Sequence, residues 1–170
     1  MNLRLGVPKE PENETRVGIV PSSMKKLLKA GFEVLIEKGA GVSANYSDAD
    51  YEAAGAKIVS RADALACENI VCINFPGIEG ISENTNLACV ADPFRNPEYV
   101  KQCISSNITL MSMDMIPRRL SRAQSMDVNS SQDNLAGYKA VLLGAANVPK
   151  GIPMMTTSAG TVRPVSYTHL

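Results

Sequence analysis

One stretch near residue 120 concentrates side chains that could do chemistry. Guanidinium, amide, carboxylate and hydroxyl groups fall within thirteen residues: Arg118, Arg119, Arg122, Gln124, Ser125, Asp127 and Ser130. An amide side chain such as that of Gln124 can bind a carboxamide, because both groups present one donor and one acceptor. An arginine beside it could orient or neutralise a phosphate or a carboxylate. The alternative is a solvated basic loop without a ligand, and these residues alone leave both interpretations open.

A glycine-rich segment is a second candidate. Gly39–Ala44 fits the GxGxx(G/A) pattern of a dinucleotide-binding turn. Such a turn should open directly into a helix, and an acidic residue should end a strand about 20 residues later. Here the polar stretch Ser43–Tyr46 precedes the helix, and the predicted strand Lys57–Val59 ends without an acidic residue. We therefore interpret the segment as a turn that uses the positive φ open to glycine.

Arg16 is a third candidate, because the segment Pro8–Val17 follows the first predicted strand. Ligands of open α/β sheets bind outside the carboxyl ends of the strands. Arg16 could hold a carboxylate or an amide there, and a solvated surface charge is the alternative.

Cysteine and histidine usage argues against a metal site. The four cysteines lie in apolar segments without CxxC spacing: Cys67, Cys72, Cys89 and Cys103. We expect reduced thiols in the core. His169 is the only imidazole and lies one residue from the end of the sequence, so a mechanism that needs a histidine base has no good candidate.

The composition limits the class of protein. The 170 residues carry 17 Lys plus Arg and 17 Asp plus Glu, and 45% of them are apolar. This length and apolar content suffice for one domain with a core. A formal charge of zero argues against a nucleic-acid partner. Because no run reaches the roughly 18 apolar residues that a membrane span needs, and no signal peptide precedes the first strand, we expect a soluble intracellular domain.

The elements that must position these candidates alternate between strands and helices. The predicted strands are Leu3–Val7, Glu33–Glu37, Lys57–Val59, Ile70–Asn74, Leu87–Ala91 and Thr109–Met113. The predicted helices are Pro21–Ala30, Ser47–Ala54, Arg61–Cys67 and Asn96–Ser105. Alternation of this kind predicts an α/β fold, namely a Rossmann-like (flavodoxin-like), doubly wound, mainly parallel sheet in three layers.

The composition and the hydrophobic pattern change after residue 116. Residues 117–127 are polar, basic and aperiodic, which predicts a long loop. The next segment, Ser130–Ala145, has apolar residues at helical spacing, and a short linker rich in Pro and Gly precedes Met154–Ala159. Met111, Met113 and Met115 alternate with polar residues and are expected on the buried face of the last strand.

The loop and the helix after it carry a family resemblance. The segments Ser121–Asp127 and Ser130–Val141 resemble the N-terminal, NAD(H)-binding component (alpha subunit) of the proton-translocating NAD(P) transhydrogenases, which share a fold with the alanine dehydrogenases. The resemblance extends through Gly6–Glu10, Tyr51–Ala56 and Pro153–Thr161. It covers nearly everything from Leu3 to Pro164.

The resemblance implies roles for particular residues. In that family the loop places an Arg, a Gln and an Asp beside the nicotinamide, with a Ser three residues after the Asp. The spacing assigns catalytic roles to Arg119, Gln124 and Asp127, and cofactor binding to these three with Ser130. The family usually has one Arg at this place, whereas Arg118 and Arg119 are adjacent here. The resemblance therefore leaves open which of the two takes the role.

The resemblance also implies an activity. Hydride passes from NADH to NADP⁺ on a partner component, and the transfer is coupled to proton translocation by a membrane component. The alternatives are an alanine dehydrogenase-like NAD-dependent oxidoreductase and a non-catalytic assembly module. Alanine dehydrogenases bind pyruvate with an Arg matching Arg16 and use a Lys and a His in two following strands. Val71–Pro76 has no Lys and Leu87–Asp92 has no His, which favours the transhydrogenase.

The organisation follows from the same resemblance. Residues 1–127 are expected to form the N-terminal domain, 128–164 a long helix and linker leading into an NAD-binding Rossmann domain outside this sequence, and 165–170 a non-native tail. The implied cofactors are NAD(H) here and NADP(H) on the partner. A homodimer through the absent domain is expected. The expected location is the cytoplasmic side of a bacterial inner membrane, or an organelle matrix.

Overall fold

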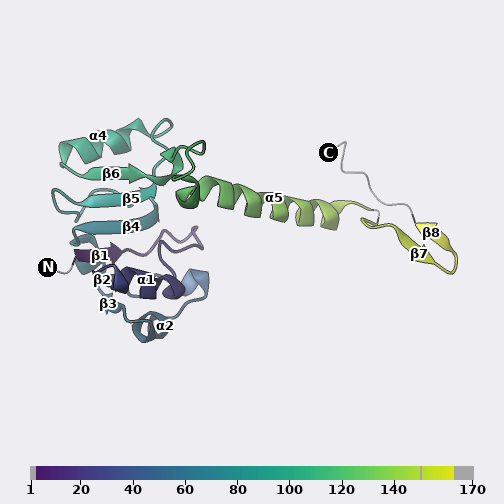
Figure 1. Cartoon of the computed structure of the whole chain (residues 1–170), viewed down its shortest axis with the longest axis horizontal. Coiled ribbons are helices and arrows are strands. Elements are labelled where there is room, and N and C mark those ends of the chain that lie inside the picture. The colour runs from purple at the N-terminus through teal and green to yellow at the C-terminus, as the bar shows by residue number, and fades with distance from the viewer. Residues whose placement is uncertain (1–2, 150, 163–170) are drawn as a thin grey trace. The chain divides into compact units, whose positions relative to one another are not determined.

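A computed structural model of the chain describes residues 3–149 and 151–162. The chain divides into two compact units, Met1–Asp127 and Val128–Leu170. The first unit contains a six-stranded sheet with short helices, and the second contains one long helix and a two-stranded hairpin (Figure 1).

The sheet of the first unit has the order β3-β2-β1-β4-β5-β6, and every neighbouring pair is parallel. Its strands are β1 (Leu3–Val7), β2 (Phe32–Glu37), β3 (Lys57–Val59), β4 (Asn69–Asn74), β5 (Asn86–Val90) and β6 (Thr109–Ser112). All six predicted strands are confirmed, with ends that move by at most one residue.

Four α-helices connect these strands: α1 (Met24–Lys29), α2 (Asp48–Ala53), α3 (Arg61–Leu65) and α4 (Pro97–Ser105). The predicted helix from Pro21 begins as a 3₁₀ turn over Pro21–Ser23. Ser47 caps α2, because Ser47 Oγ accepts from Asp50 N at 3.3 Å while Ser47 N donates to Asp50 Oδ2 at 2.7 Å. No helix joins β4 to β5.

The helices cover both faces of the sheet. Right-handed crossovers put α1 and α2 on one face, and the reversed direction from β3 to β4 puts α3 and α4 on the other. Each face has its own buried cluster: one includes Leu5, Ile36 and Tyr51, and the other includes Leu87 and Cys103. The predicted three-layer, doubly wound fold is therefore confirmed, with the strand order of dinucleotide-binding Rossmann sheets rather than the five-stranded flavodoxin order.

Helix α3 lies very close to the centre of the sheet. A Cβ added to Gly6 on β1 would lie 1.9 Å from the backbone oxygen of Ala64 in α3, so only glycine permits this packing. The burial predicted for the cysteines is also confirmed, since all four are free and buried.

The prediction for the methionines near β6 is wrong. Met111 and Met115 are both nearly half exposed. Strand β6 is an edge strand that ends at Ser112, and Met113–Met115 forms a 3₁₀ turn. The period-2 alternation therefore stops before it can place all three side chains on one face.

The second unit consists of α5 (Val128–Asn147) and the antiparallel hairpin β7 (Met155–Thr157) and β8 (Gly160–Val162). The predicted helix is confirmed and is longer at both ends, whereas the hairpin is absent from the prediction. None of the residues of α5 is buried. Within residues 3–149 and 151–162, the helices are too short or too polar to cross a bilayer. The predicted tail 165–170 and His169 lie outside the described residues.

Candidate functional site

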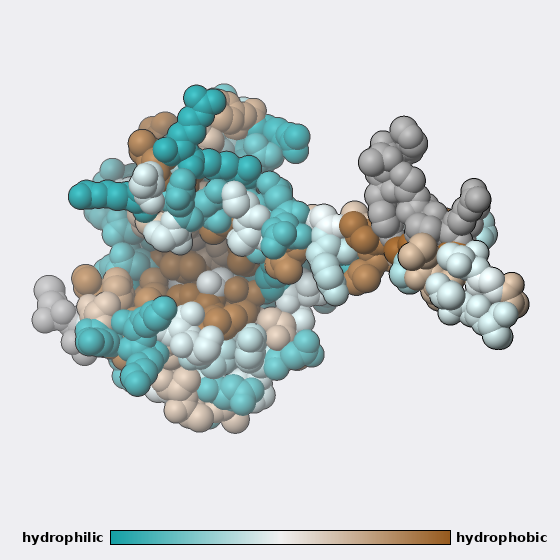
Figure 2. Space-filling view, turned by 45° about the vertical axis from the view of Figure 1, so that its right-hand side comes forward, coloured by the Kyte–Doolittle hydropathy of each residue, from teal (hydrophilic) through white to brown (hydrophobic). Residues whose placement is uncertain are grey.

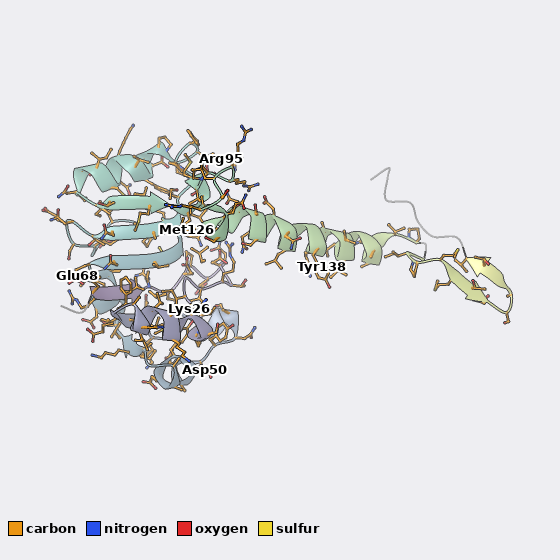
Figure 3. The ribbon with its side chains drawn as sticks, viewed as in Figure 1. Lys26, Asp50, Glu68, Arg95, Met126 and Tyr138 are labelled. Carbon is orange, nitrogen blue, oxygen red and sulfur yellow. The ribbon has the colours of Figure 1, made fainter. Side chains whose placement is uncertain are left out.

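The candidate residues gather where the parallel strands of the first unit end. The loops after β1, β4, β5 and β6 meet at this carboxyl edge, and the connection direction reverses between β1 and β4. Ligands of doubly wound sheets bind at such a switch point. Figure 3 shows Arg95 and Met126 at this edge, whereas Glu68 lies at the opposite end of the sheet.

The loop Pro117–Asp127 is ordered by local turns. Backbone bonds join Ala123 N to Leu120 O and Met126 N to Ala123 O, each at 2.9 Å, and a 3₁₀ turn covers Gln124–Met126. Ala123 is buried, while the side chains on either side of it are exposed. A small residue thus anchors the loop, which leaves the polar side chains around it at the surface.

The structure pairs Asp127 with Arg118. Arg118 Nε lies 3.7 Å from Asp127 Oδ2, and the Asp127 side chain is 9% exposed. Arg119 and Gln124 are exposed, and their side chains make no hydrogen bond or ion pair within the portion of the chain that the structure describes. The geometry brings together Arg118 and Asp127, and it presents the Gln124 amide to solvent. Ser130 belongs to the second unit and lies in the first turn of α5.

Asp114 was not among the predicted residues, although it ties two strand ends together. Asp114 Oδ1 accepts from Ser112 Oγ at 2.5 Å and from Ala91 N at 3.2 Å. It thereby joins the end of β5 to the end of β6, immediately before the loop begins. An acidic residue two positions after a strand-ending Ser is the signal that could have indicated it.

Arg16 takes part in a polar network at the ends of β1 and β4. Its Nε and Nη2 donate to Glu14 Oε1 and Oε2 at 2.9 and 2.7 Å. Asn74 Nδ2 donates to Glu14 Oε2 at 3.2 Å and to Glu10 Oε2 at 3.1 Å. The hydrogen bond from Arg16, opposed by partial burial, lowers the pKa of Glu14 to about 2. Arg16 remains a surface charge, with a side chain that is 45% exposed, and a carboxylate of the same loop binds its guanidinium group.

The glycine-rich segment forms a packed turn. Gly39 has φ 74° and its N–H donates to Asp48 Oδ1 at 2.8 Å, so a carboxylate already engages this amide. A Cβ on Gly41 would lie 2.5 Å from the Tyr51 ring. The segment continues into the three-residue 3₁₀ turn Val42–Ala44 and not into an α-helix. These contacts agree with the interpretation of Gly39–Ala44 as a structural turn.

Comparisons with known proteins show the family to which this chain belongs. Residues 6–136 match the family described as alanine dehydrogenase/PNT, N-terminal domain. The chain is 43% identical over 173 residues to the first portion of NAD(P) transhydrogenase subunit alpha of Rhodospirillum rubrum, with 95% of this chain and 45% of the relative covered. This chain thus has an α/β Rossmann-like fold and belongs to the alanine dehydrogenase/PNT N-terminal domain family.

Solved structures of a transhydrogenase and of an alanine dehydrogenase are both similar to this chain. A crystal structure of transhydrogenase from Sinorhizobium meliloti is similar with a TM-score of 0.88 and 39% identity, and the match covers 95% of this chain and 49% of that one. An L-alanine dehydrogenase structure is similar with a TM-score of 0.65 and 32% identity over 71% of this chain and 34% of that one. The transhydrogenase resemblance predicted from the sequence is confirmed, and the chain spans about half the length of the two transhydrogenase relatives.

Proposed function

We propose that the protein to which this chain belongs is an NAD(P) transhydrogenase, and that this portion positions the nicotinamide ring of NADH. The observation that carries the proposal is the loop after β6, where Asp127 is tethered to Arg118 and the Gln124 amide is unpaired among the described residues. NAD(H) supplies the hydride when bound, and NADP⁺ on a partner component accepts it. A membrane component couples the transfer to proton translocation.

The donor set of this loop fits a nicotinamide carboxamide. Gln124 can donate to its oxygen and accept from its amide N–H₂. The Arg118 guanidinium, fixed by Asp127, keeps further donors at the same loop. Ser130 is the fourth proposed contact. Positioning is the main catalytic task in a direct hydride transfer, because no proton needs to move at the carbon centres.

The proposal includes a choice between neighbouring arginines. The family spacing favours Arg119, whereas the ion pair to the largely buried Asp127 favours Arg118 as the positioning arginine. In the full-length protein, Arg118→Ala should slow hydride transfer about 100-fold, and Arg119→Ala should slow it less than about threefold. Single-turnover hydride transfer measures both. The reverse pattern would assign the role to Arg119.

The site residues can be tested in the same assay. Gln124→Ala and Asp127→Ala should each slow hydride transfer about 100-fold while changing the Kd for NADH less than about threefold. An orienting role acts on the geometry of the transfer more than on binding. Equal losses in rate and affinity would contradict it.

The groups at the ends of β4 and β5 favour transhydrogenase over alanine dehydrogenase chemistry. An amide, Asn74, ends β4 and donates to Glu10 and Glu14, and β5 contains no Lys or His. An amide cannot serve as the proton donor that reductive amination of a carbonyl requires. Oxidation of NADH by the full-length protein that depends on ammonium and pyruvate would overturn the choice.

The remaining elements of the proposal concern assembly. We propose residues 1–127 as the nicotinamide-positioning domain, and 128–164 as the connection to a second, NAD-binding domain through which the protein dimerises. Its place is the cytoplasmic face of a bacterial inner membrane or an organelle matrix. Calorimetric titration of the 170-residue chain with NADH should give a Kd above about 1 mM. Micromolar binding would show that Gly39–Ala44 or another local site binds the dinucleotide without that domain.

A further inference from the structure

Asp114 lies just beyond the point where backbone pairing between β5 and β6 stops. The register between these strands ends at the pair Cys89 and Ser112. Past this pair, Asp114 Oδ1 accepts from Ala91 N at 3.2 Å, so a side chain makes the next cross-strand bond. The same oxygen accepts from Ser112 Oγ at 2.5 Å, which fixes the carboxylate relative to its own strand. Asp114 thus extends the link between the two strand ends.

The segment that Asp114 binds is held by bonds of its own. Ala91 is buried, and its carbonyl oxygen accepts from Asn96 Nδ2 at 3.1 Å. Asp92 O accepts from the backbone N–H groups of Arg95 and Asn96 at 3.0 and 2.9 Å, which closes the turn before α4. Because these bonds do not involve Asp114, its carboxylate attaches the chain after β6 to a segment that is already fixed.

The contacts inside the loop Pro117–Asp127 set its shape more than its place on the sheet. The backbone bonds within it join residues three or four positions apart, and the Arg118–Asp127 ion pair joins its start to its end. Burial of Ala123 fixes one point of the loop, and a second point is needed to set its orientation. The bond to Ala91 supplies that point, because it joins the chain four residues before Arg118 to the neighbouring strand end.

We propose that Asp114 is a positioning residue for hydride transfer. By holding the start of the loop against the end of β5, it sets the place of the Gln124 amide and of the Arg118–Asp127 pair relative to the sheet. The inference rests on the proposed function, because it concerns the same nicotinamide site. Asp114 acts through the loop and does not itself contact the nicotinamide. A displacement of about 1 Å in a reacting group can slow a transfer about 100-fold, so a residue outside the contacts can control the rate.

The full-length protein tests this role by kinetics. Asp114→Ala should slow single-turnover hydride transfer about tenfold and change the Kd for NADH less than about threefold. Asp114→Asn should keep the rate within about threefold of the parent, because an amide oxygen can accept the same two bonds as Oδ1. Equal losses of rate and affinity in Asp114→Ala, or no rescue by Asp114→Asn, would overturn the proposal.

Asp50→Ala is the matched control. Asp50 also accepts from a serine hydroxyl and a backbone N–H, since Ser47 Oγ and N lie 2.6 and 2.7 Å from its Oδ2. It belongs to α2, away from the edge that carries Arg95 and Met126 (Figure 3). This variant should remove comparable hydrogen bonds and leave hydride transfer unchanged. A loss equal to that of Asp114→Ala would mean that the rate follows general stability, which contradicts the positioning role.

The order of the loop can be measured without hydride transfer. In the 170-residue chain, ¹⁵N order parameters of backbone amides 120–126 should fall from about 0.8 to below about 0.6 in Asp114→Ala and stay unchanged in Asp50→Ala. Unchanged values in Asp114→Ala would overturn the inference. If the values fall and Gln124→Ala slows the transfer while Asp114→Ala does not, the inference fails and the proposed function stands. If neither variant slows the transfer, both fail.

A second substitution replaces Asp114→Ala if that variant does not fold. In Asp114→Ser the hydroxyl lies one bond nearer the backbone than Oδ1, so it cannot keep both bonds at their present lengths. Asp114→Ser should slow hydride transfer at least about threefold with the Kd for NADH unchanged. A rate equal to that of the parent would contradict the proposal.

Discussion

The two units of the chain use apolar residues in opposite ways. The first unit buries them on both faces of a parallel sheet, where Leu87 is fully buried. The second unit leaves them at its surface, where Leu135 is 61% exposed and Tyr138, labelled in Figure 3, is 67% exposed. Figure 2 adds that the first unit shows apolar surface within a hollow between hydrophilic margins. The sheet has a core of its own, whereas none of the residues of α5 is buried.

This difference identifies the source of stability. An isolated helix is marginal in water, because most helical stability in proteins comes from packing of an apolar face. We therefore infer that folding of the 170-residue chain is driven by the first unit, and that α5 contributes little to the free energy of unfolding.

The largest expected effect compares one leucine in each unit. Leu87→Ala should lower the free energy of unfolding by about 3 kcal/mol, because it opens a cavity in a fully buried site. Leu135→Ala should change it by less than about 0.5 kcal/mol. Urea unfolding followed by circular dichroism measures both, and equal losses would mean that α5 is packed in solution.

A pair of tyrosines gives a smaller contrast. Tyr51 is fully buried and its hydroxyl donates to Ile19 O at 2.8 Å, so Tyr51→Phe should cost about 1–2 kcal/mol at pH 7 by leaving that carbonyl unpaired. Tyr138→Phe should cost nothing measurable. Both variants are compared with the parent chain by urea unfolding.

Burial also raises the pKa of Tyr51 to about 12. The folded chain therefore holds the phenol proton more tightly than the unfolded chain, whose value is 10.0. The corresponding stability is complete below pH 10 and is lost as the pH rises toward 12. This alkaline loss should disappear in Tyr51→Phe and persist in Tyr138→Phe, and a loss that survives in Tyr51→Phe would assign it to another group.

Glu14 gives an acid counterpart. Its pKa is about 2 in the folded chain against 4.5 in the unfolded chain, so it contributes stability above pH 4.5 that is lost as the pH falls toward 2. Since Arg16 is 45% exposed, solvent screening reduces this contribution to about 1 kcal/mol. Glu14→Gln should flatten the stability difference between pH 4.5 and pH 2. An unchanged pH profile in that variant would contradict the ion pair.

The smallest effect is expected from removing the second unit. In a chain that ends at Asp127, the free energy of unfolding should differ from that of the 170-residue chain by less than about 0.5 kcal/mol. The urea midpoint measures this difference. A clear decrease in the urea midpoint would contradict the inference that α5 contributes little to the free energy of unfolding.

The site was partly predictable from the sequence. The loop, its amide and its carboxylate are visible as residue types at family spacing. Two consecutive arginines have the same chemistry, so only the fold could pair Arg118 with Asp127. Asp114 was missed because its partners, Ser112 and Ala91, meet only when β5 and β6 lie side by side.

Local patterns predicted the elements where apolar runs have clear ends. Each strand of the sheet was found because apolar runs end at Gly, Pro or polar residues. The hairpin β7–β8 was missed because its strand residues are all exposed and form no apolar run in the sequence. The exposure of Met111 was missed because alternation says which residues share a face, and not whether that face is covered.

The amino-acid sequence alone determined the alternating α/β elements, the family resemblance and the loop that carries the proposed chemistry, because these depend on residue types at short spacing. The tertiary structure decided the strand order, the pairing of Arg118 with Asp127, the binding of Arg16 by Glu14 and the link from Asp114 to Ala91. The strand order and the link from Asp114 to Ala91 depend on residues from different strand ends, whereas each ion pair joins two residues of one loop and depends on how that loop turns. The relative positions of the strand ends are set by the crossover from β3 to β4, which no local pattern records.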